Sequence, residues 1–184
     1  MTSQEIFTQI LNHMVKGLMV HEQLANYYDF LGLQGYRRCH EYHYVKENEE
    51  YRKLTHYYIK KYNELVPEFT FNNPSLIPAS WYNYHRQDVD MKTKQQAVQN
   101  GLNEWINWES ETCTLYERMY QELLNNEDIA ASFKVKKLIE DVEEELLTVE
   151  KYQLNKQSTN YDMTSVIEEQ KPLHCYYKQK IKED

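Results

Sequence analysis

The sequence predicts an all-α protein: a four-helix bundle with one long crossover between its second and third helices, followed by a short C-terminal helix. Two observations predict this architecture. Apolar residues recur at helical spacing through four long segments, and no segment shows the alternation of a β-strand. The four glycines and four prolines gather at a few places in the 184 residues, so they mark the breaks between those segments.

Each helix follows from an apolar stripe bounded by such breaks. The first stripe runs through Phe7, Ile10, Met14, Leu18, His21, Ala25 and Tyr28. Thr2 and Glu5 have the spacing of a capping box at its start, and Gly32 and Gly35 end it in a turn. We expect helices at about residues 4–31, 36–65, 92–125 and 129–156, with a shorter one within residues 160–184.

The segment between the second and third helices decides the topology. A helix of about thirty residues is about 45 Å long. An extended chain needs roughly fourteen residues to return over that distance, and the aromatic-rich segment 67–90 is longer than this. The sequence therefore predicts two helical hairpins joined by a crossover. We expect residues 1–184 to form a single domain.

Composition and charge exclude several classes of function. The net charge of −8 argues against DNA as a partner. The three cysteines, Cys39, Cys113 and Cys175, include no Cys-x-x-Cys pair, so a cysteine-based zinc site is not expected. The start of the chain has no signal-peptide pattern, and no apolar run approaches the ~20 residues needed to span a membrane. We expect a cytoplasmic protein without a membrane partner.

The second helix has polar residues where its core-facing stripe should continue. Stepping back from Leu54 in threes and fours leads through Glu50, Glu47, His43, His40 and Tyr36. One interpretation is that the helix rotates, so that Tyr44, Val45 and Tyr51 pack and the acids face water. The other is a metal site inside the bundle, since buried ionisable groups are costly unless they are paired or bind a metal.

The height of each residue along the bundle distinguishes candidates for such a site. Counting from the first turn places His21 and Glu22 within a turn of His43 and Glu47. Counting from the second turn, near residue 127, places residues 109 and 145 at the same level, and both are glutamates. The candidate metal ligands are His21 or Glu22, His43, Glu47, Glu109 and Glu145, with Glu50 as an outer or alternative ligand.

Two stretches resemble a known family. "HEQLANYY", followed by "GYRR", is similar to the first helix and the start of the second helix in ferritin-like proteins, bacterioferritin especially. "FLGLQGYRRCHEY" resembles the turn region of the Dps branch. The resemblance implies a bundle that binds two irons between carboxylates, oxidises iron with oxygen or peroxide, and assembles into a cage. The chain departs from the family because it has no Glu-x-x-His motif. Lys53 stands three residues after Glu50, where the motif would have its histidine.

The sequence is therefore compatible with two functions. The first is a ferritin-like protein that binds iron, as a di-iron site, or another divalent metal, for storage or oxidation, and that forms a homo-oligomer. The alternative is a metal-free, tyrosine-rich bundle that acts as an interaction or assembly protein. In that case residues 67–90 or the C-terminal helix would contact a protein partner.

Overall fold

The structure is a computed structural model that describes residues 1–68 and 89–183. The described residues form five α-helices and no strand, which confirms the all-α prediction. The helices are α1 (Ser3–Phe30), α2 (Gln34–Tyr62), α3 (Met91–Asn125), α4 (Ile129–Ser158) and α5 (Met163–Glu183). Most of the crossover segment, and with it one contact surface of the interaction hypothesis, lies outside the described residues.

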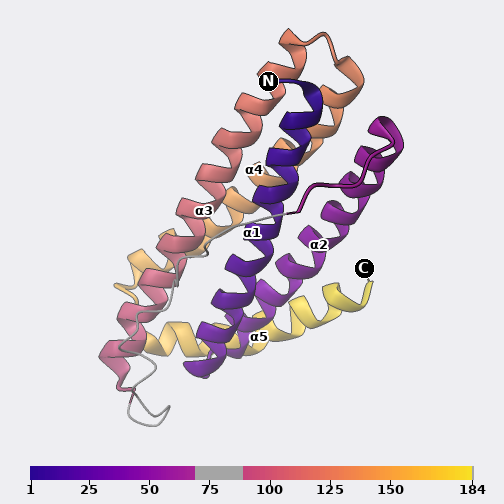
Figure 1. The fold of residues 1–184 in the computed structure, drawn as a ribbon. Helices are drawn as coiled ribbons and strands as arrows, with labels where there is room; N and C mark the ends of the chain where they lie inside the picture. The colour runs from indigo at the N-terminus through magenta and orange to yellow at the C-terminus, as the bar shows by residue number, and fades with distance from the viewer. Residues whose placement is uncertain (69–88, 184) are drawn as a thin grey trace.

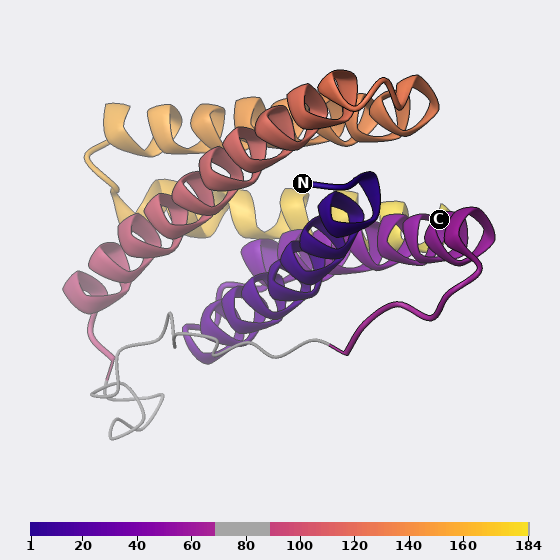
Figure 2. The same cartoon turned by 45° about the horizontal axis from the view of Figure 1, so that its top comes forward.

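The helices form two antiparallel hairpins, α1 with α2 and α3 with α4 (Figure 1). Helices α2 and α3 run in the same direction, so the chain has to return along the bundle between them (Figure 1). This is the long crossover that the sequence predicts. Helix α1 also packs on α3, and α5 packs mainly along α2 (Figure 2).

Local signals set most of the helix ends. The capping box at the start of α1 is present: the Thr2 hydroxyl accepts from the Glu5 amide at 3.2 Å, and the Glu5 carboxylate accepts from the Thr2 amide at 2.8 Å. Asp90 caps α3 by accepting from the Thr93 amide at 2.7 Å. Helix α2 ends at Tyr62 instead of residue 65, because Asn63 adopts a left-handed conformation with φ of 53°.

Helix α2 has no cap of its own, and α5 supplies one. Leu33, at the N-cap, makes no side-chain hydrogen bond. The Gln170 side-chain oxygen accepts instead from the amides of Gly35, at 2.9 Å, and Tyr36, at 3.4 Å. A carbonyl oxygen at this end satisfies amides that the helix itself leaves unpaired. The C-terminal helix is thus part of the fold of the first hairpin.

The two glycines of the first turn have different roles. Gly32 has a φ of 76°, a left-handed conformation that other residues rarely adopt. Gly35 lies within α2, where a Cβ atom would be only 2.7 Å from the backbone oxygen of Gln170. Gly35 therefore allows α5 to approach α2 closely enough for the cap to form.

The apolar core is divided into two clusters along the bundle. The cluster near the N-terminus includes Phe7, Ile10, Leu54, Tyr58, Met119, Leu123 and Val135. The other cluster includes Leu24, Tyr28, Tyr36, Leu102, Trp105, Val149 and Val166. Between these clusters each of the first four helices places a buried or part-buried ionisable side chain. They are His21 on α1, His43 and Glu47 on α2, Glu109 on α3 and Glu145 on α4.

Gly35→Ala tests the role assigned to Gly35. Alanine normally stabilises a helix interior relative to glycine by roughly 0.5–1 kcal/mol. Here we expect the free energy of unfolding to fall by about 1–3 kcal/mol, because the added Cβ would overlap Gln170. Urea unfolding of both proteins measures the change, and Glu49→Ala on the exposed side of α2 is the control. An increase in stability would show that α5 does not pack this closely.

Candidate metal centre

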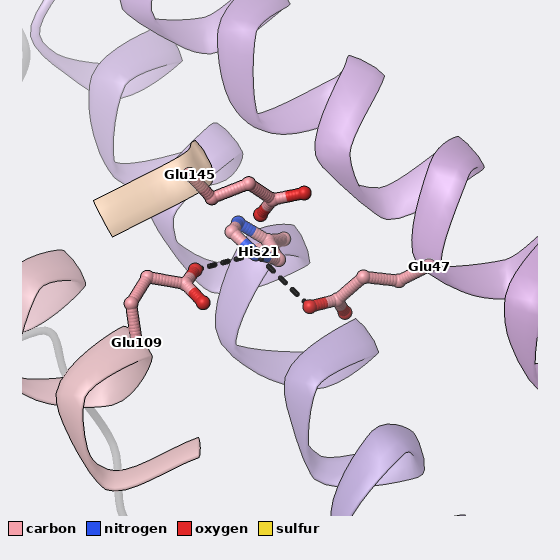
Figure 3. A group of neighbouring side chains, drawn as sticks. All are labelled: His21, Glu47, Glu109 and Glu145. Carbon is pink, nitrogen blue, oxygen red and sulfur yellow. Dashed lines mark ion pairs between the residues drawn. The ribbon is translucent and has the colours of Figure 1, made fainter. Parts of the chain in front are cut away.

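The polar layer brings four potential ligands together, one from each of the first four helices. They are His21 from α1, Glu47 from α2, Glu109 from α3 and Glu145 from α4 (Figure 3). One nitrogen or oxygen atom of each lies within 4.8 Å of those of the other three. All four helices pass this height of the bundle (Figure 1).

His21 lies at the centre of the group, fully buried (Figure 3). Its Nε2 atom is 3.4 Å from Glu47 Oε1 and 3.6 Å from Glu109 Oε1. Its Nδ1 atom is 3.0 Å from Nδ1 of His40, which is also fully buried. The indole N–H of Trp105 donates to Glu109 Oε1 at 2.8 Å and so fixes that carboxylate.

Glu145 is held by two groups from α2. His43 Nδ1 lies 3.0 Å from Glu145 Oε2, and Lys46 Nζ lies 3.0 Å from Glu145 Oε1. His43 is buried, and Lys46 is partly exposed at the edge of the layer. The ammonium group therefore belongs to the carboxylate cluster and is not only a surface charge.

Gly17 makes room for the carboxylate of Glu47. A Cβ atom at position 17 would lie 2.7 Å from Glu47 Oε2. That oxygen is buried and has no hydrogen-bond partner among the described residues. Gly17, in the middle of α1, therefore leaves room in the core for a carboxylate oxygen of Glu47 that has no hydrogen bond among the described residues.

Burial and mutual charge shift the ionisation of the whole group. Burial alone would lower the pKa of His21, but the carboxylates of Glu47 and Glu109 raise it to about 10. Burial raises the pKa of Glu47 and of Glu109 above the ordinary value. Burial acts in the same sense on Glu145, but His43 and Lys46 outweigh it and lower that pKa. Without a metal, His21 therefore carries the positive charge at the centre.

His40 has the opposite shift. Burial, and then the neighbouring His21 and His43, lower its pKa well below the ordinary value. His40 is therefore neutral, so its Nδ1 atom can accept a hydrogen bond from Nδ1–H of His21. This contact leaves Nε2 of His21 as the atom that faces the carboxylates.

Several buried polar atoms of the site lack a hydrogen-bond partner within the described residues. They are His21 Nε2, His40 Nε2, both ring nitrogens of His43, and Glu47 Oε2. Buried polar atoms are nearly always hydrogen-bonded, so each such exception calls for an explanation. Imidazole nitrogens and carboxylate oxygens are ligands for iron, manganese and zinc. The residues present therefore fit a divalent metal ion.

Most of the candidate metal ligands proposed from the sequence lie at the site, but not all of them do. His21, Glu47, Glu109 and Glu145 come together, and His43 contacts Glu145. Glu50 lines the outer part of the site and pairs with Lys53 at 2.7 Å. Glu22 is exposed, where it accepts from Asn26 at 3.3 Å. The rotated α2 is not found, because His40 and His43 are buried while Tyr44, Val45 and Tyr51 are partly exposed.

Three neighbours of the site were not proposed as functional from the sequence: His40, Lys46 and Trp105. His40 and Trp105 lie on the core-facing stripes, so their burial could be expected. Lys46 directly precedes Glu47, and only the approach of α4 reveals its contact with Glu145. A second potential metal group, Cys113 with Glu117 and Glu143, is more exposed.

Comparisons with known proteins support the fold. No protein-family model and no curated protein matches the sequence. Among solved structures, an open-pore ferritin from the hyperthermophilic archaeon Archaeoglobus fulgidus superposes with a TM-score of 0.75 at 12% identity, covering 94% of this chain and 95% of that one. The fold is ferritin-like. An engineered closed form of the same ferritin matches with the same TM-score and identity, covering 94% of each chain.

The ferritin-like fold confirms the predicted plan of four helices, a crossover and an additional C-terminal helix. At this level of identity the likeness concerns the fold alone. None of the helices in the described residues is long and apolar enough to cross a membrane.

The charge on His21 can be measured directly. In metal-free protein we expect its ring to titrate with a pKa of about 10, because Glu47 and Glu109 outweigh the effect of burial. An unfolded histidine titrates near ~6.5. This group therefore adds to the free energy of unfolding below that pH, and the contribution is lost as the pH rises through about 10. An NMR titration of the histidine ring nitrogens measures the pKa.

His13, on the same helix, is the internal control. Burial, and then Lys16, lower its pKa to about 4. The two rings should thus titrate on opposite sides of the ordinary value. A normal pKa for His21 would mean that its ion pairs with Glu47 and Glu109 do not form.

Proposed function

We propose that the chain binds a divalent metal ion between its four long helices, with iron as the first candidate, for storage or oxidation. The observation that carries the proposal is the convergence of His21, Glu47, Glu109 and Glu145, in which the buried Nε2 atom of His21 lies 3.4 Å from Glu47 and 3.6 Å from Glu109. Iron is placed first because the similar solved structures are ferritins. The oxygen-rich donor set suits iron, manganese or zinc better than copper(I).

The metal-free arrangement indicates how the protein would receive the ion. The positive charge on His21 now balances the buried carboxylates. A metal ligand must be deprotonated, so Nε2 of His21 would release its proton when the ion binds. Nδ1–H would continue to donate to His40, which fixes the tautomer and the orientation of the ring. Binding would therefore strengthen as the pH rises.

The surrounding residues hold the carboxylates in place. Trp105 donates to Glu109, and His43 and Lys46 contact Glu145. The two apolar clusters pack on either side of the layer along the bundle. Iron bound there would supply the redox chemistry with oxygen or peroxide. Consumption of oxygen on addition of Fe(II) distinguishes an oxidising site from one that only stores or holds the ion.

An assembly role, with or without a metal, is favoured by one further observation. Phe133, Leu147 and Leu154 on α4 are 65%, 55% and 63% exposed. Leu147 and Leu154 are seven residues apart, and Phe133 lies fourteen residues before Leu147, so all three lie along one line of the helix. We propose that this line contributes to a homo-oligomer. If no metal binds and the chain still self-associates through α4, the interaction hypothesis becomes the better one.

Loss of one carboxylate tests the metal site. Metal-free protein is dialysed without oxygen against Fe(II), and bound iron is measured by elemental analysis. We expect Glu109→Gln and Glu47→Gln each to weaken Fe(II) binding by at least about tenfold. Even the loss of a residue that only hydrogen-bonds to a ligand typically weakens metal binding by about tenfold to a hundredfold. The charge is lost in both variants, while the size of the side chain is kept.

Glu117→Gln is the matched control, because Glu117 belongs to the more exposed group with Cys113 and Glu143. It should leave binding at the central site unchanged. If Glu117→Gln removes the bound iron and Glu109→Gln does not, the metal binds at the surface and the proposed site is wrong.

Gly17→Ala tests the same site without removing a ligand. The added methyl group would meet Glu47 Oε2 at 2.7 Å and displace that carboxylate. We expect weaker Fe(II) binding in a protein whose helix content, measured by circular dichroism, is unchanged. Unaltered affinity would show that Glu47 does not contribute to binding from this position.

A further inference from the structure

We propose that Lys46 is a built-in cation that occupies the outer half of the carboxylate cluster, so that each chain binds one divalent ion and not two. This inference rests on the proposed metal-binding function and concerns the number of ions. The di-iron expectation from the sequence would require the ammonium group to leave. Lys46 thereby determines the stoichiometry of the site.

The cluster continues outward from the four ligands as a small cavity. This cavity has a volume of about 40 Å³. Its lining includes Lys46, Glu47, Glu50, Asp141 and Glu145, which come from the facing sides of α2 and α4. A cavity of that size can hold water molecules or an ion. Four carboxylates thus line a space in which Lys46 is the one cationic side chain of the lining residues.

Lys46 already occupies the position of a second cation. Its Nζ atom is 3.0 Å from Glu145 Oε1, and the other oxygen of Glu145 is 3.0 Å from His43. The ammonium side chain is partly buried, whereas Lys53 on the same helix is largely exposed. Glu145 therefore connects an inner half, with His21 and Glu109, to an outer half that Lys46 closes.

The charges of the cluster favour a single divalent ion. One such ion and Lys46 together balance the charge of Glu47, Glu109 and Glu145. A second divalent ion would compete with the ammonium of Lys46, 3.0 Å from Glu145 Oε1, for that carboxylate, and the two cations would repel each other. If the ammonium were absent, Asp141 and Glu50 could complete a second set of ligands with Glu145.

His43 supports this division of the cluster. Its side chain is 95% buried and both ring nitrogens lack a hydrogen bond among the described residues, although Nδ1 is close to Glu145. The His43 ring packs against His21 and Trp105 and does not line the outer cavity, so it contacts Glu145 from the inner side of the layer. Lys46 contacts the other oxygen of Glu145 at the cavity.

The test is the number of Zn²⁺ ions bound per chain, measured by equilibrium dialysis and elemental analysis. Zn²⁺ has no redox chemistry, so the measurement does not depend on activity. All proteins carry Cys113→Ser, which removes the thiol of the more exposed group. We expect one ion for the otherwise unchanged chain, two for Lys46→Met, and one for Lys46→Arg, which keeps the charge.

Two further variants complete the design. Lys136→Met removes an exposed lysine that pairs with Glu140 on α4, and it should still bind one ion. Adding Asp141→Asn to Lys46→Met should return the number from two to one. Circular dichroism confirms that each variant is folded.

The outcomes separate the inference from the function on which it rests. Two ions in the otherwise unchanged chain, or one in folded Lys46→Met, would overturn the role of Lys46 and leave metal binding intact. No bound ion in any variant would overturn the proposed function itself. If Lys46→Met does not fold, the numbers for the unchanged chain and for Lys46→Arg still decide between one ion and two.

Discussion

The burial of three carboxylates at one height of a helical bundle is the constraint on which the structure depends. Glu47, Glu109 and Glu145 come from three different helices and are largely removed from water. Buried charges of one sign are strongly destabilising unless cations or hydrogen-bond donors compensate them. His21 and Lys46 supply the positive charge, and Trp105 supplies a donor. A bound metal ion would replace the single positive charge on His21 with a larger one.

The rest of the fold holds this layer together. Apolar clusters on either side of it provide the packing that a polar layer cannot provide, and the two hairpins pass the same height of the bundle. Helix α5 caps the start of α2 through Gln170, next to the turn between α1 and α2. The distance from this turn determines the height of His43 in the bundle. An ion pair at 2.5 Å between the buried Lys156 and the part-buried Glu169 joins α4 to α5. The C-terminal helix thus stabilises the hairpin that carries two of the candidate groups.

The height and the approximate face of the candidate site could be predicted from the sequence, because both follow from regular helices. Counting from the first and second turns selects His21 or Glu22, His43, Glu47, Glu109 and Glu145. Four of these, His21 and the three glutamates at 47, 109 and 145, converge in the structure. The same count cannot separate His21 from Glu22, since neighbouring residues differ little in height; the rotation of α1 decides between them. Lys46 and Gly35 could not be predicted because their roles depend on α4 and α5, which are distant in sequence.

We expect the four helices to hold a metal ion in place of the proton on His21. Anomalous diffraction from a crystal grown with Fe(II) under anaerobic conditions is the decisive measurement, because it locates the ion among its ligands. A peak should appear between His21 Nε2, Glu47, Glu109 and Glu145. A map with no peak there, and with His21 still paired with Glu47 and Glu109, would contradict it and favour a metal-free bundle.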